Sequence, residues 1–307
     1  MKKRIQNRLA ESRFAFPVMI IYGLAVWLGA GTVAEGAYLQ LVFFVASTLL
    51  MMMLNNTNSL IRIYSRMVSC SFVAMTCVAT FLFSSLESCA TGMCFILFYL
   101  SLLRSYQDKR APGIAFYSFA CLGIASLFFV QILYFVPFLW ILMASNMMAL
   151  THRMFWATVL GLVMPYWFAV GYYVVTNQFD AFIDHFAELA QFEPLLQYEA
   201  LDIHRIATFG LVVLLAVIGI IHYMRNSYLD KIRTRMIFEM FITVDILSFV
   251  FIILQPQHFD NLLPIIIVNT SCLFAHYVAL TRTWLTNVTF IVMCLATLGL
   301  TIFNLMP

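Results

Sequence analysis

The chain has 307 residues, of which 63% are hydrophobic and only 10% are Asp, Glu, Lys or Arg. Soluble domains carry about 25% charged residues, so this composition excludes a water-soluble fold. The net charge of +3 comes with no basic, aromatic-interleaved patch that would indicate nucleic acid as a partner. The surrounding solvent is therefore lipid, in which only helices and closed barrels pair every backbone N–H and C=O.

Continuous apolar runs decide between these two architectures. Barrel strands alternate polar and apolar residues over about 10 positions, whereas the runs here are unbroken over roughly 20 residues, the length of a spanning helix. We therefore predict an all-α polytopic transmembrane helix bundle with about eleven spans, built as a single domain over residues 1–307.

The spans can be placed in chain order. We expect them at 14–33, 37–54, 67–85, 88–103, 112–129, 132–150, 154–176, 206–224, 236–254, 261–280 and 284–305. The first run is longer than the apolar region of a signal peptide, so it should be an uncleaved helix. The stretch 112–150 is too long for one span, and Gln131 is the expected turn within it.

The basic residues predict the orientation of the bundle. Lys and Arg collect in cytoplasmic loops because positive charge resists translocation. With the N-terminus in the cytoplasm, all of the 17 Lys and Arg residues except Arg205 fall on the cytoplasmic side. The acidic residues fall mostly in the opposite loops. An odd number of spans then places the C-terminus outside.

The longest outer segment, 177–205, has the pattern of an amphipathic helix. Its apolar residues recur at helical spacing and are Phe179, Phe182, Ile183, Phe186, Leu189 and Ala190. Acidic residues mark the opposite face. We expect a helix lying in the outer interface that stops near Pro194 and serves either as a packed lid or as a gate or partner surface.

Three stretches resemble a known family: 54–67 (LNNTNSLIRIYSRM), 94–129 and 258–287. Together they resemble polytopic inner-membrane proteins of Bacteroidota for which no activity is established. The resemblance covers most of the chain and consists of loose hydrophobic patterns with a few polar anchors. It implies a location in a bacterial inner membrane, and no functional residue is carried over from it.

Polar residues inside the spans are the first candidate site. A charged group at the centre of a bilayer costs roughly 2.5–3.5 kcal/mol on insertion scales, and Asp245 lies near the middle of its span. Asn269 and His276 lie two turns apart on the next span. An Asp245–His276 pair would form either a structural clamp between helices, or a proton or cation relay, or a contact to a lipid headgroup.

The cytoplasmic end of the second span is the second candidate site. Asn55 precedes Arg62 and Arg66, and the spacing of four between the two arginines would place them on one helical face. They either anchor the span at the cytoplasmic surface or bind an anionic lipid headgroup.

Prolines and one loop acid carry weaker signals. Pro137, Pro165 and Pro264 interrupt predicted spans, as in transporters with broken helices and in many ordinary membrane helices. Glu35 lies in the first outer loop, where membrane glycosyltransferases that use polyprenyl-phosphate sugars also place an acid. The seven cysteines form no Cys-x-x-Cys pair, and we predict no metal, catalytic residue or cofactor.

Three classes of function remain. We favour a non-enzymatic inner-membrane protein of envelope biogenesis, which handles an anionic or polyprenyl lipid or supports a complex of membrane proteins. The first alternative is a secondary transporter or channel that uses Asp245. The second is a polyprenyl-phosphate-dependent glycosyltransferase that uses Glu35.

Overall fold

A computed structural model describes residues 4–192 and 201–306. It is 82% helical, and no strand occurs in this part of the chain. The α-helices are α1 (Ile5–Ala10), α2 (Ala15–Gly29), α3 (Tyr38–Asn58), α4 (Met67–Val78), α5 (Leu86–Leu102), α6 (Pro112–Phe128), α7 (Val136–Ser145), α8 (His152–Val175), α9 (Phe179–Ala187), α10 (Ile203–Asn226), α11 (Ile232–Leu254), α12 (Phe259–Leu280) and α13 (Trp284–Leu305). Short 3-10 helices are η1 (Thr80–Leu82), η2 (Leu103–Ser105), η3 (Val130–Phe135), η4 (Glu188–Ala190), η6 (Ser227–Leu229) and η7 (Pro256–His258).

Seven of the described helices are long and apolar enough to cross a membrane: α3, α5, α8, α10, α11, α12 and α13. Shorter apolar helices occupy Ala15–Gly29, Met67–Val78, Pro112–Phe128 and Val130–Ser145, which are the positions of the other predicted spans. The predicted all-α multi-helix membrane architecture is therefore confirmed.

Some predicted helix boundaries were wrong. The expected span 67–85 ends as an α-helix at Val78, because Ala79 leaves the helical conformation with ψ 57° and the chain continues as η1. The predicted break at Gln131 lies in η3, between α6 and α7. Pro137 does not interrupt a helix, since it occupies the first turn of α7, where its missing N–H has no helical partner to lose. Pro165 and Pro264 do lie inside α8 and α12.

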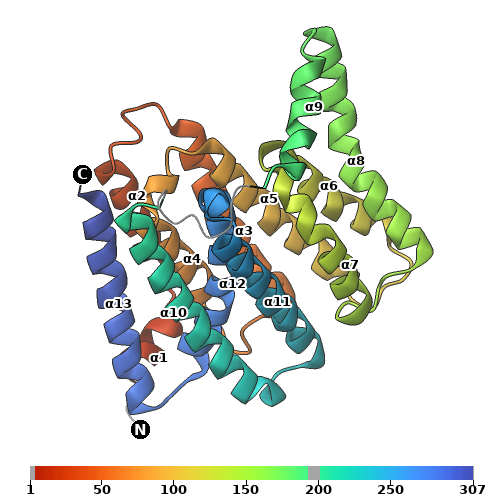
Figure 1. Cartoon of the computed structure of the whole chain (residues 1–307). Helices are drawn as coiled ribbons and strands as arrows, with labels where there is room; N and C mark the ends of the chain where they lie inside the picture. Colours follow the sequence, from red (N-terminus) through yellow and green to blue (C-terminus); the bar gives the residue numbers. More distant parts are fainter. Residues whose placement is uncertain (1–3, 193–200, 307) are drawn as a thin grey trace.

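The helix α12 forms the centre of the bundle, packed against α4, α5, α10 and α11 (Figure 1). In its most apolar stretch 94% of the residues are buried, against 17% in α13 and 22% in α8. A helix that is apolar all round and buried on all sides belongs in the core of a bundle. Polar residues on α12 are therefore held within protein and away from lipid.

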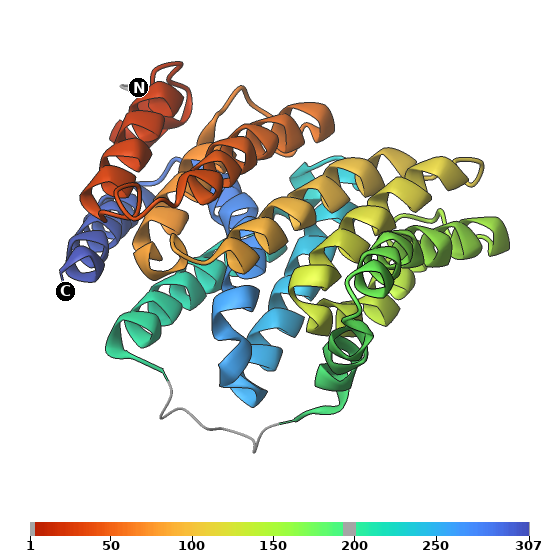
Figure 2. The same cartoon turned by 90° about the horizontal axis from the view of Figure 1, so that it is seen from above.

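The helices α6 and α8 pack with their backbones close together. A Cβ atom on Gly161 would lie 2.2 Å from the carbonyl oxygen of Phe116, and one on Gly123 would lie 2.6 Å from that of Leu162. Small residues let membrane helices approach until their backbones touch. Figures 1 and 2 place α6–α9 on one side of the molecule, with α2 and α13 on the other.

The helix α9 follows only part of the amphipathic pattern predicted for residues 177–205. Phe182 and Phe186 pack on Tyr166 of α8, at ring-centroid distances of 6.4 and 5.0 Å. Asp180 and Asp184 are exposed. Phe179 and Ile183, predicted for the apolar face, are 46% and 54% exposed. The predicted stop near Pro194 lies outside the described residues.

Side-chain contacts sort the loops into two sets. One set joins loops predicted to be cytoplasmic: Arg4 donates to the carbonyl of Arg282 at 2.9 Å, and Arg62 lies 3.8 Å from Asp230. The other set joins loops predicted to be outside, including Arg205 with Asp260 at 2.9 Å. Loops assigned to the same side by charge therefore meet in space.

Candidate functional site

Asp245 lies in a polar cluster at the middle of the bundle. Its side chain is fully buried, and its Oδ2 accepts a hydrogen bond from the Thr270 hydroxyl of α12 at 3.0 Å. Next to Thr270, Asn269 accepts a hydrogen bond from the hydroxyl of Tyr99 at 2.8 Å. These two bonds tie α5 and α11 to the central helix.

Two buried atoms of this cluster have no hydrogen-bond partner within the described residues: Oδ1 of Asp245 and Nδ2 of Asn269. A buried polar atom without a partner costs about 1–3 kcal/mol. The two hydrogen bonds that join the helices therefore leave one polar atom of Asp245 and one of Asn269 unused.

His276 belongs to a different cluster. Its Nε2 lies 2.9 Å from Oδ2 of Asp230, and both side chains are buried, at 1% and 3% exposure. Thr270 and His276 are six residues apart, roughly 9 Å along the helix axis. His276 therefore contacts Asp230, in the turn between α10 and α11. Asp245 contacts Thr270, about 1.7 turns away from His276 along α12. The structure thus gives the two members of the predicted pair separate partners.

Asp230 was not predicted from the sequence as part of a site. It stands alone as an acid in a loop that carries Arg225, Lys231, Arg233 and Arg235. A single acid among four basic residues could have marked Asp230 as a candidate partner for a buried group. Nothing in the local sequence indicated that its side chain is buried. The ring of His222 lies 5.5 Å from that of His276 and completes the cluster.

The structure separates Arg62 from Arg66. Ser59 adopts the left-handed conformation with φ 50° and ends α3, so residues 59–66 form an irregular connection and the predicted shared helical face does not exist. Arg62 is engaged with Asp230 and with the carbonyl of Leu229. Asn55 donates to the carbonyl of Ser65 at 3.0 Å and holds the connection in place.

Arg66 retains donor capacity that the described residues do not use. Its Nε donates to the Tyr64 hydroxyl at 3.3 Å, and the guanidinium carbon lies 5.5 Å from the centre of that ring. Its Nη1 is buried and has no hydrogen-bond partner in the described part of the chain. A guanidinium nitrogen in this position is suited to an anionic oxygen atom.

Next to Arg66 begins an apolar chamber of about 400 Å³. Its walls come from α2, α4 and α13, with contributions from α10 and α12. Met67 and Cys70, which follow Arg66 in α4, line it, and Cys70 donates its backbone N–H to the carbonyl of Arg66 at 3.1 Å. Arg66 itself does not line the chamber, but it directly precedes Met67, one of the lining residues.

The short helix α1 closes this end of the chamber, and its Leu9 is one of the lining residues. Two polar side chains hold it there. Gln6 donates to the carbonyl of Val278 at 2.7 Å, and Asn7 donates to that of Thr281 at 2.9 Å. These bonds fix the position of α1 at this end of the chamber. The helix α1 could not be predicted from the sequence, because six residues are too few for a clear helical pattern.

Glu35 has no comparable setting. It is exposed in the turn between α2 and α3 and does not line the 400 Å³ chamber. Among the described residues, no group of three or more His, Cys, Asp or Glu could hold a metal ion.

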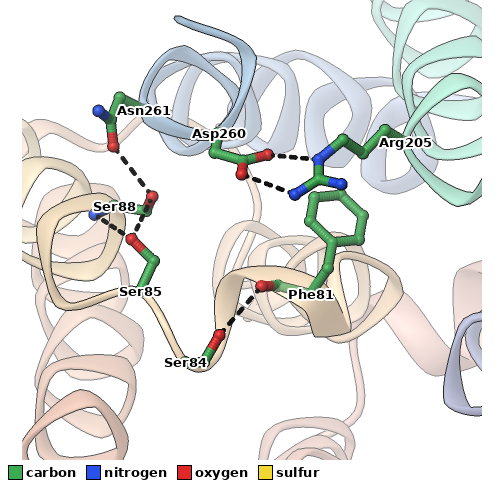
Figure 3. A network of polar contacts seen from close by, with 7 residues as sticks. All are labelled: Phe81, Ser84, Ser85, Ser88, Arg205, Asp260 and Asn261. Carbon is green, nitrogen blue, oxygen red and sulfur yellow. Dashed lines mark hydrogen bonds and ion pairs between the residues drawn. The ribbon is translucent and has the colours of Figure 1, made fainter. Parts of the chain in front are cut away.

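At the other end of the bundle, Figure 3 shows a polar network that explains the one exceptional arginine. Arg205 donates from Nε and Nη2 to the two carboxylate oxygens of Asp260, both at 2.9 Å, and its guanidinium lies 5.2 Å from the Phe81 ring centre. Nearby, Ser88 donates to Asn261 at 3.0 Å. The single basic residue predicted outside is thus neutralised by a bidentate ion pair.

The fold and its clusters define a multi-helix membrane protein with buried polar contacts and a lateral apolar chamber. In comparisons with known proteins, no family model, no curated protein and no solved structure matches the chain. The resemblance to inner-membrane proteins of Bacteroidota stays a prediction.

Proposed function

We propose that the chain is a bacterial inner-membrane protein that handles an anionic lipid in envelope biogenesis. In this proposal all eleven apolar helices cross the bilayer, the N-terminus is cytoplasmic and the C-terminus lies outside. The arrangement of the basic residues supports this orientation. The two sets of loop contacts agree with it.

One observation carries the proposal: the 400 Å³ apolar chamber, whose lining residue Met67 directly follows Arg66 in the chain. Its volume falls within the range of about 300–1,000 Å³ that small-molecule sites occupy. The walls are almost entirely apolar and include Met19, Met75 and Met293, whose flexible side chains adapt to an irregular chain. In a membrane the occupant that fits such walls is a lipid chain.

Charge selects the class of lipid. Arg66, next to the lining residue Met67, has a buried Nη1 without a partner among the described residues, and such a nitrogen is suited to a phosphate oxygen, whereas Arg62 is already paired with Asp230. The cytoplasmic leaflet carries the anionic lipids that basic residues attract. A phospholipid or polyprenyl phosphate, with its chain in the chamber and its phosphate at Arg66, satisfies both ends.

The test is mass spectrometry of the lipids that stay bound after gentle extraction. We expect the native protein to be enriched in a specific anionic lipid. Ala74→Trp fills the chamber, which Ala74 lines, and should abolish the enrichment. Leu160→Trp is the matched control, because Leu160 is 62% exposed on α8 and does not line the chamber.

Retention of bulk phospholipids in membrane proportions by the native protein would overturn lipid handling. If the Ala74→Trp variant keeps the enrichment, the lipid binds at a site other than the chamber.

A transporter or channel remains the second candidate, because of Asp245. A fully buried carboxylate with one oxygen unpaired among the described residues is the kind of group that proton- and ion-coupled transporters use. Against this, neither Asp245 nor its partner Thr270 lines the 400 Å³ chamber, whereas Arg66 directly precedes its lining residue Met67. Lipid handling is therefore favoured.

A further inference from the structure

A second cavity, of about 200 Å³, lies where α9 folds back on α8, far along the chain from the lipid chamber. Aromatic side chains form most of its wall: Tyr166, Tyr172, Tyr173 and Phe182, together with His185. The remaining lining residues are small or aliphatic. A volume of this size holds a small headgroup or solute and is too small for a whole lipid.

Hydrogen bonds hold two of the walls in position. The Tyr166 hydroxyl donates to Oγ of Ser126 at 2.8 Å, and Nε2 of His185 donates to the carbonyl of the same serine at 3.0 Å. These two bonds fix the side chains of Tyr166 and His185 in the cavity wall.

The part of the chain that supplies most of the cavity wall carries charge of one sign. Residues 154–204 contain six Asp and Glu residues and no Lys or Arg. Three of the acids, Asp180, Asp184 and Glu188, are exposed on α9 and η4, and α9 also supplies the lining residues Phe182 and His185. Their field concentrates cations and repels anions.

The aromatic rings of the wall also favour a cation as the ligand. A cation over the face of Tyr or Phe, within about 6 Å of the ring centre, is attracted by the negative π-face, and cages of such rings bind organic ammonium groups. Phe182 lies 6.0 Å from Tyr173 and 6.4 Å from Tyr166, so several faces border one small volume. Acidic surroundings with an aromatic wall favour a cation over a neutral solute.

We propose that the cavity between α8 and α9 binds a small organic ammonium group, from either a lipid headgroup or a soluble amine. This site stands apart from the proposed lipid chamber and does not depend on it. It gives the outer segment a ligand-binding role.

The test is a binding titration of the purified full chain in maltoside micelles with choline and with its uncharged isostere, 3,3-dimethylbutan-1-ol. We expect choline to bind about tenfold more tightly, the preference that desolvated cation–π contacts provide. Equal binding of the two compounds, or no binding of choline, would overturn the proposal.

Variants locate the site. Tyr173→Leu and Phe182→Leu each remove a π-face and should weaken choline binding about tenfold, whereas Tyr173→Phe keeps the face and should bind as the native protein does. Trp167→Leu is the control, because Trp167 is 77% exposed on α8 and does not line the cavity. Native-like binding by both leucine variants would refute the assignment, and the phenylalanine variant separates loss of the ring from misfolding.

A competition experiment identifies the source of the ammonium group. Reconstitution in nanodiscs of phosphatidylethanolamine blocks choline binding if the site takes a lipid headgroup. If choline binds equally in phosphatidylethanolamine and phosphatidylglycerol nanodiscs, the ligand is a soluble amine. Both results support the ammonium site.

Discussion

Single residues in this protein differ most in whether their polar atoms are paired. Arg62 and Arg205 are both arginines near the ends of spans, yet each has an aspartate partner. Arg66 keeps a buried nitrogen without a partner in the described structure. Pairing, which depends on distant segments, thus separates a structural arginine from a candidate ligand-binding one.

Arg66→Gln should remove the enrichment of anionic lipid and leave neutral lipid bound. Glutamine keeps most of the length and polarity of the side chain and loses the charge. The measurement is the lipid mass spectrum of the extracted protein. Arg104→Gln is the control, since Arg104 is an exposed arginine in η2, none of whose residues lines the chamber. An equal loss in both variants would show that general surface charge, and not Arg66, selects the lipid.

Asp245→Asn should leave both stability and lipid retention near those of the native protein. Asparagine still offers an oxygen to the Thr270 hydroxyl but has no charge. Asp245→Leu removes that acceptor, and the buried Thr270 hydroxyl should then lower the free energy of unfolding by about 1–3 kcal/mol. Thermal unfolding in detergent measures both effects. Loss of ion-coupled flux in liposomes with Asp245→Asn would instead favour the transporter.

At the scale of the helices, small residues decide which pairs touch. An apolar pattern does not determine which membrane helices pack together, because lipid tails are as apolar as leucine. Small residues favour particular pairs because they let two backbones approach closely, as Gly123 and Gly161 do between α6 and α8. The pairing of these helices then positions α9 and the aromatic cavity.

Gly161→Ala should destabilise the α6–α8 pair, because its Cβ would lie 2.2 Å from the Phe116 carbonyl oxygen and the helices must separate. We expect a loss of about 1–3 kcal/mol, as for other overpacked sites. Gly171→Ala is the matched control on the same helix, since a Cβ there has no neighbour within 4 Å. The melting temperature in detergent measures both, and an equal change would contradict the close contact.

At the scale of the whole molecule, the apolar helices surround α12 and the loops fall into two sets. Four of these helices are shorter than a standard span, with α4 only 12 residues long. The proposal that they also cross the membrane determines on which side each loop lies.

Labelling of single cysteines in intact cells, in a chain whose native cysteines are replaced, tests this topology. With a membrane-impermeant maleimide we expect Glu35→Cys to react and Lys109→Cys to react only after the cells are opened. Both positions are exposed, so access depends on the side of the membrane. Labelling of Lys109→Cys in intact cells would invert the orientation or change the number of crossings.

The sequence by itself determined the class of fold and the positions of most helices. Both follow from local composition: an unbroken apolar run of about 20 residues is stable only as a spanning helix, whatever its neighbours are. The same logic predicts on which side of the membrane each charged loop lies, because Lys and Arg resist translocation. The sequence also identified Asp245, an acid in the middle of a predicted span, and Arg66, a basic residue at the end of one, as candidate site residues.

Only the tertiary structure decided which polar groups meet. His276 pairs with Asp230 instead of Asp245, and Arg62 is neutralised while Arg66 is not. These partners lie 46 and 168 positions away along the chain for His276 and Arg62. The apolar chamber and the aromatic cavity were equally beyond the sequence, because a cavity forms where several helices fail to fill the space between them. That depends on packing angles and side-chain volumes, which no periodicity in a single chain records.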